Sequence, residues 1–72
     1  MGDKVFLLDE TLKKWKGKRI ALAVGSESSF TGVLENFDEE IIILRDVADI
    51  VGNRGKELIV KIDDVTWLMR LE

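Results

Sequence analysis

The apolar positions in the first part of the chain recur with the period of an α-helix. Over residues 5–16 one apolar side chain falls on each turn, which predicts a helix with a single apolar face. Acidic residues lie in the first half of this segment and lysines at its end, an order that complements the helix dipole. Gly17 is well placed to terminate the helix. The apolar stripe consists of Val5, Leu8, Leu12 and Trp15.

From residue 19 onward the apolar positions follow the period of β-strands. Residues 19–24 alternate large aliphatic side chains with alanines, which predicts a strand with small residues on its second face. Gly32 lies inside the next predicted strand, where a glycine marks a bend or a close backbone approach. Residues 41–44 are all apolar and predict a strand buried on both faces. The other strands are predicted at 29–38, 57–62 and 65–71, with a loop at 47–55 and a tight turn at 63–64.

One helix followed by five strands with short connections predicts a mostly β, single domain over residues 1–72. The compact arrangement of these elements is a strongly bent five-stranded antiparallel sheet, an open barrel capped by the N-terminal helix. The last two strands are too apolar to remain as solvent-facing edges. We therefore expect them to pair with neighbouring copies, and head-to-tail pairing that closes gives a homo-oligomeric ring.

The amino-acid composition supports association between copies of the chain and argues against several other structural and functional classes. A chain of 72 residues without Cys or His has neither disulfides nor a zinc site to stabilise a small core. The net charge of −3 counts against non-specific nucleic-acid binding but permits a local basic patch. No secretory signal and no apolar run of membrane-spanning length is visible, so we expect a cytoplasmic protein without membrane contact.

Two segments resemble the sequence motifs of the Sm-like (LSm) family, archaeal type. GKRIALAVGSESSFTGVLENFD contains the pattern F-x-G-x-L followed by an aromatic-Asp pair, and ELIVKIDDVTWLMRL is similar to the second motif. The resemblance implies the bent sheet described above and rings of six or seven subunits, in which strand four pairs with strand five of the next copy. The matching positions are Ile20, Leu22, Val24, Phe30, Gly32, Leu34, Phe37, Asp38, Val65 and Leu68.

In the family, uridine-type bases stack in a pocket between the loop after strand two and the loop between strands four and five. The resemblance places this pocket at Asp38, Glu40, Ile42 and Lys61. Glu40 has no flat face for a base and repels phosphates, and Ile42 offers no hydrogen bond. Lys61 replaces a planar guanidinium with a point charge. Since only Asp38 keeps the family's residue type, we expect a degenerate oligo-U pocket.

The stretch FDEEIIILRD has three adjacent carboxylates, at Asp38, Glu39 and Glu40. One interpretation is a site for a hard cation such as Mg²⁺. The other is a structural Asp38 followed by two solvated acids, and we favour it because consecutive side chains point to different sides. We expect no metal and no cofactor.

Basic residues gather in two segments, at the end of the predicted helix and in the predicted loop. Either segment is a candidate to contact RNA phosphates. The segment at the end of the helix has an alternative interpretation, in which its lysines only complement the helix dipole and Trp15 packs on the barrel. We favour this alternative for that segment. The candidates are Lys13, Lys14, Lys16, Lys18, Arg19, Arg54 and Lys56.

Catalytic motifs are absent from the sequence. There is no His, Cys or Tyr, no nucleophile motif and no phosphate-binding glycine loop. We therefore predict no catalytic residues and a non-enzymatic, RNA-associated ring that acts in RNA metabolism or as a ribonucleoprotein scaffold. The alternative is a ring that scaffolds proteins and does not bind RNA.

Overall fold

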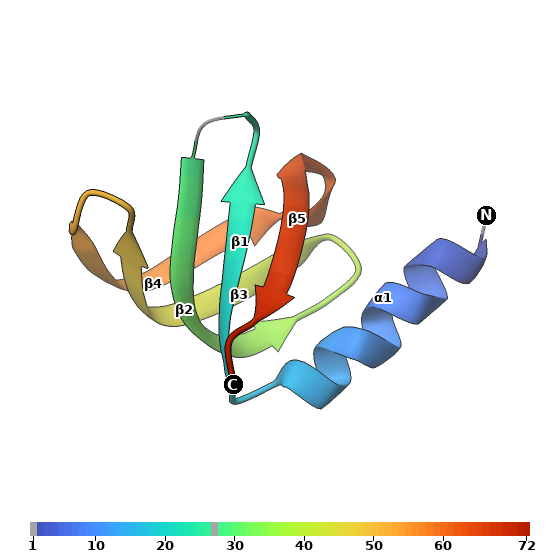
Figure 1. Cartoon of the computed structure of the whole chain (residues 1–72). Helices are drawn as coiled ribbons and strands as arrows, with labels where there is room; N and C mark the ends of the chain where they lie inside the picture. Colours follow the sequence, from blue (N-terminus) through green and yellow to red (C-terminus); the bar gives the residue numbers. More distant parts are fainter. Residues whose placement is uncertain (1, 27) are drawn as a thin grey trace.

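The computed structural model describes residues 2–26 and 28–72, with residues 2–6 described by their backbone only. It has the predicted order of one helix and five strands (Figure 1). The elements are α1 Gly2–Trp15, β1 Arg19–Val24, β2 Ser28–Phe37, β3 Ile41–Asp49, β4 Arg54–Lys61, the 3₁₀ turn η1 Ile62–Asp64, and β5 Val65–Arg70.

The strands form one five-stranded sheet in the order β4-β3-β2-β1-β5, with every neighbouring pair antiparallel. Figure 1 shows the sheet curling, so that β3 and β4 cross behind β1, β2 and β5. The predicted fold class is thus confirmed. Strands β4 and β5 are the two edges of the sheet.

The inner face of the curled sheet forms the core. Ile20, Leu22, Leu34 and Leu44 are fully buried there. Burial of each such side chain stabilises the fold by about 1.5–3 kcal/mol. Because strand side chains alternate between faces, the residues between them lie on the outer face of the sheet.

Helix α1 attaches to the core through its apolar stripe. Leu12 is buried, and Leu8 and Trp15 are half-buried against the core, as predicted; the side chain of Val5 lies outside the described residues. Gly17 adopts a φ of 86°, and its N–H donates to the Leu34 carbonyl at 2.8 Å, which ends the helix beside the sheet. Within the part of the chain that the structure describes, no helix is long and apolar enough to cross a membrane.

Gly32 lies at a close approach between β2 and β3, as the sequence predicts. A Cβ at this position would lie 3.0 Å from the Arg45 carbonyl oxygen and 3.3 Å from a Val47 methyl carbon. Opposite it, the register of β2 with β3 shifts, and Asp46 has a φ of 52°. The extra residue in β3 is a β-bulge, which bends the strand.

The prediction of a loop at residues 47–55 is wrong. Residues 47–49 continue β3 past the bulge and residues 54–55 begin β4, so the two strands form one long hairpin. Its turn is closed by Asp49, whose Oδ1 accepts hydrogen bonds from the N–H groups of Val51 and Asn53. The glycines and charges that indicate a loop in the sequence belong instead to a short turn and to solvent-facing strand positions.

The prediction that residues 41–44 are buried on both faces is confirmed for one face only. Ile42 and Leu44 point into the core, while Ile41 and Ile43 are half-buried on the outer face. The outer face of β3 therefore retains apolar surface beside the edge strand β4.

Candidate nucleic-acid interface

The loop between β2 and β3 is held together by Asp38. Its Oδ1 accepts hydrogen bonds from the backbone N–H of Glu40 at 2.7 Å and of Ile41 at 2.9 Å. These two bonds, that from Glu40 first, lower the pKa of the Asp38 carboxyl because they stabilise its charged form. Asp38 therefore stabilises the backbone of this loop, the role that the favoured interpretation gives it.

The same loop lies against the turn before β5. The Ile62 N–H donates to the Glu40 carbonyl at 2.9 Å, and Lys61 is the register partner of Ile41. Three of the four family pocket positions, Asp38, Glu40 and Lys61, therefore lie at one end of the molecule and are exposed. Ile42 does not join them, because its side chain is fully buried in the core.

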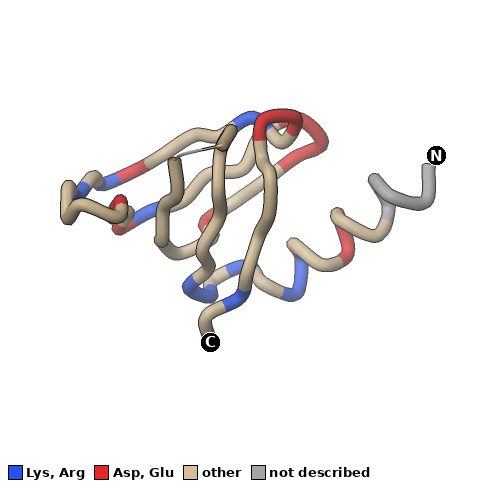
Figure 2. The backbone as a smooth tube through the Cα atoms, turned by 45° about the horizontal axis from the view of Figure 1, so that its top comes forward, with Lys and Arg blue, Asp and Glu red and all other residues tan. Residues whose placement is uncertain are grey.

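This end of the molecule is acidic. Figure 2 shows the acidic segments of the β2–β3 loop and of η1 at the same end of the backbone, and the hydrogen bond from Ile62 to Glu40 joins these two segments. Within residues 2–26 and 28–72, no group of three or more acidic side chains is arranged to hold a metal ion. The acidic residues are Asp38, Glu39, Glu40, Asp63 and Asp64.

The basic residues in the last turn of α1 and directly after it lie toward the C-terminus, away from the acidic loops (Figure 2). Lys13 forms an ion pair with Asp9 at 3.4 Å, one helical turn away. Trp15 packs against the core, as the favoured interpretation of this segment predicts. The exposed lysines of this basic end are Lys13, Lys14, Lys16 and Lys18.

The other three basic candidates meet in a groove on the outer face of the sheet. Arg19 at the start of β1 and Arg54 and Lys56 in β4 line a hollow of about 520 Å³. Its floor lies beside the bulge in β3, at Asp46 and Ala48. The bulge thus brings cations from distant parts of the sequence to one place.

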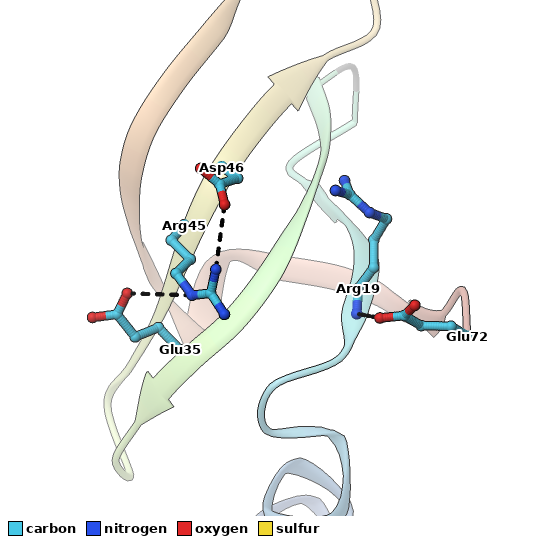
Figure 3. Close-up of polar contacts among 5 residues, drawn as sticks. All are labelled: Arg19, Glu35, Arg45, Asp46 and Glu72. Atoms are coloured by element: carbon cyan, nitrogen blue, oxygen red, sulfur yellow. Dashed lines mark hydrogen bonds and ion pairs between the residues drawn. The ribbon is translucent and has the colours of Figure 1, made fainter.

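A neighbouring cation is already neutralised. Arg45 forms ion pairs with Asp46 at 3.3 Å and with Glu35 at 3.9 Å (Figure 3). In the described part of the chain, the side chains of the three groove cations form no ion pair or hydrogen bond; Arg19 donates only its backbone N–H, to Glu72 Oε1 at 2.7 Å. The groove therefore presents uncompensated positive charge.

A second, smaller hollow of about 200 Å³ adjoins this groove and was missed by sequence reasoning. It is lined by Trp67, Phe30 and Ile50 above a floor of Ala21 and Ala48. Ala48 also lines the basic groove, so the two hollows share a boundary. The alanines on the second face of β1 were the available signal, but only the pairing of β1 with β5 places Trp67 beside them.

No protein-family model and no curated protein matches the chain. Among solved structures, it is similar to a conserved hypothetical protein from Pyrococcus furiosus, with 51% identity over 90% of this chain and 98% of the other and a TM-score of 0.80. The SmAP1 heptamer of Pyrobaculum aerophilum has 23% identity over 90% and 93% of the chains, with a TM-score of 0.80. The Sm protein of Pyrococcus abyssi in complex with a uridine heptamer has 18% identity over 85% and 93%, with a TM-score of 0.78.

Proposed function

Because this chain belongs to one family with the Pyrococcus furiosus protein and is an Sm-like protein by fold, we propose that it assembles into a closed homo-oligomeric ring that associates with RNA. The ring has six or seven subunits and no catalytic activity. Two similar proteins support this function, since one is a heptamer and another binds a uridine heptamer. This role places the protein in the cytoplasm, in RNA metabolism or as a ribonucleoprotein scaffold.

The observation that carries the ring is the apolar surface beside the two edge strands. Ile59 on β4 is 60% exposed, and Met69 on β5 is 50% exposed. Pairing β4 of one copy with β5 of the next satisfies the open backbone groups of both edges and covers apolar surface. Each copy has one edge of each kind, so the contact repeats until the ring closes.

RNA contacts in this proposal come from the basic residues and not from the family's uridine pocket. Glu40 offers no stacking surface and repels phosphates, and the buried Ile42 has no access to a ligand. Arginine and lysine attract phosphates whatever the base sequence. The contacting residues are Lys13, Lys14, Lys16, Lys18, Arg19, Arg54 and Lys56.

A second candidate function is a ring that scaffolds proteins without binding RNA. The acidic end formed by the β2–β3 loop and η1 favours it, because carboxylates repeated around a ring attract a basic protein. Purification of the native ring separates the two functions. Copurified RNA supports the first, and a basic protein in its place supports the second.

The direct test is a fluorescence anisotropy titration with labelled oligo-U and oligo-A RNA at low and at moderate salt. We expect binding that weakens with salt, because phosphate contacts release counterions. Glu40→Ala should barely change the affinity, whereas replacement of Lys13, Lys14 and Lys16 by Ala should weaken it and flatten its salt dependence.

Tight, U-selective binding that is lost in Glu40→Ala and kept in the triple lysine variant would contradict these contacts and place RNA in the family pocket. An absence of binding at low salt would reject the RNA role and leave the protein scaffold. Native mass spectrometry of the same samples reports on the ring independently of RNA.

A further inference from the structure

One row of residues runs across the outer face of the sheet with small side chains at its centre. Successive register partners in this row are Met69, Ala21, Thr31, Ala48 and Arg54, one from each strand. The small side chains of Ala21, Thr31 and Ala48 leave the face hollow between the larger residues at its two ends. The two adjoining hollows lie along this row.

The β4 end of the row is basic. Arg19, Arg54 and Lys56 line the larger hollow, and in the described chain no carboxylate pairs with their side chains. The one acidic residue in its lining, Asp46, is paired with Arg45 outside the lining. This half therefore favours an anionic ligand. A volume of about 520 Å³ is within the range of hollows that hold small organic ligands.

The β5 end of the row is aromatic. Trp67 is 44% exposed and lines the smaller hollow. Phe30 also borders this hollow, but its half-buried side chain packs against the core, so Trp67 supplies the aromatic surface. An indole exposed over a floor of alanines offers a flat surface to a planar group. A positively charged groove next to an exposed aromatic side chain is the combination that binds single-stranded nucleic acids without base preference.

We propose that single-stranded RNA crosses the outer face of the sheet, with phosphates at Arg19, Arg54 and Lys56 and a base stacked on Trp67. The inference rests on the proposed RNA association and assigns it a site distinct from the family's uridine pocket. Stacking and phosphate contacts discriminate little between bases, so oligo-U and oligo-A bind this groove with similar affinity.

The test follows Trp67 fluorescence during titration with oligo-A and oligo-U RNA. Trp15→Phe removes the other tryptophan, whose ring is half-buried against the core and outside the groove. RNA should quench the remaining Trp67 emission. Trp67→Leu, made in the wild-type chain, should lower the affinity measured by anisotropy by about fivefold or more, the effect of one stacked base.

Arg54→Gln and Arg70→Gln are a matched pair of variants that test whether the positive charge in the groove contacts RNA phosphates. Arg54 lines the groove, whereas Arg70 alternates with Met69 along β5 and lies outside its lining. Arg54→Gln should weaken binding and reduce the slope of log affinity against log salt by about 0.7, one phosphate contact to a single strand. Arg70→Gln should leave both values unchanged. Native mass spectrometry verifies that each variant keeps the wild-type assembly.

Two results would overturn the assignment in different ways. RNA binding that leaves Trp67 emission unchanged and is equal in wild type, Arg54→Gln and Trp67→Leu would reject this groove while the RNA-associated ring stands. No RNA binding by the wild-type ring would reject the RNA role itself, and the groove with it.

Discussion

At the scale of single residues, the tightest constraint is the contact between Gly32 and the bulge in β3. The Arg45 carbonyl oxygen occupies the space where any other residue at position 32 would carry its Cβ. Asp46 takes a left-handed conformation directly after it. These residues bend the sheet at the place where the basic groove is formed.

Gly32→Ala should therefore destabilise the protein by about 1–3 kcal/mol, the usual cost of inserting a carbon into a packed site. The neighbouring atoms are a backbone oxygen, the Cβ of Leu44 and a methyl carbon of the β-branched Val47, which move less easily than the end of a flexible side chain. Urea unfolding at a fixed protein concentration measures the change.

Gly55→Ala is the matched control, because no heavy atom lies within 4 Å of the added Cβ and the φ of Gly55 is not positive. Its effect should stay within about 1 kcal/mol. Equal losses from both glycines would refute the close approach at Gly32.

At the scale of elements, α1 depends on a few side chains for its place on the sheet. Leu12 is buried in the core, while Leu8 and Trp15 are half-buried beside it. Leu7, on the same helix, is 67% exposed. The helix is thus anchored by one face in its second half.

Leu12→Ala should cost about 2–5 kcal/mol, since it removes buried methyl groups and leaves a cavity between helix and sheet. Leu7→Ala, the same substitution at an exposed position, should change stability by less than about 0.5 kcal/mol. Urea unfolding followed by circular dichroism compares the two. A smaller loss for Leu12→Ala than for Leu7→Ala would mean that the helix docks by its other face.

The β3–β4 hairpin is the region where the sequence pattern predicted the strand boundaries incorrectly. Arg45 and Asp46 interrupt the apolar pattern, and two glycines follow, so the segment has the composition of a loop. Two interactions outweigh that composition. The bulge at Asp46 lets the strand continue, and Asp49 closes the turn with hydrogen bonds to Val51 and Asn53. The Asn53 side-chain amide donates to Asp49 as well and is the main cause that lowers the pKa of this carboxyl.

At the scale of the whole molecule, the unpaired edges of β4 and β5 decide what assembly is available. Both edges carry exposed apolar side chains, and they belong to the opposite margins of one sheet. The acidic loops lie at one end, and the basic residues in the last turn of α1 and directly after it lie near the other (Figure 2). In a ring, every copy contributes the same two charged ends, so the charges accumulate on separate surfaces.

Ile59→Lys should break the proposed ring, because it places a charge in the β4 edge contact and a desolvated charge is costly. Val51→Lys is the control: Val51 is 80% exposed at the hairpin tip and lies outside the edge strands. Native mass spectrometry should find monomers or small species for Ile59→Lys and the wild-type assembly for Val51→Lys. An intact ring in Ile59→Lys would contradict edge pairing through β4.

The sequence by itself determined the helix-first order, the apolar stripe of α1, the close approach at Gly32 and the structural role of Asp38. The helix order, the apolar stripe and the Asp38 hydrogen bonds are local, because they depend on periodicity or on bonds within a few residues. The partners of Gly32 lie in another strand, and the sequence indicated this contact only because a glycine inside a strand marks a close approach. Only the tertiary structure decided which of residues 41–44 enter the core and that residues 47–55 form strand ends and a turn. It also placed Arg19 with Arg54 and Lys56, and Trp67 beside Ala21. These residues meet through strand register and a bulge between elements far apart in the chain, which no local pattern encodes.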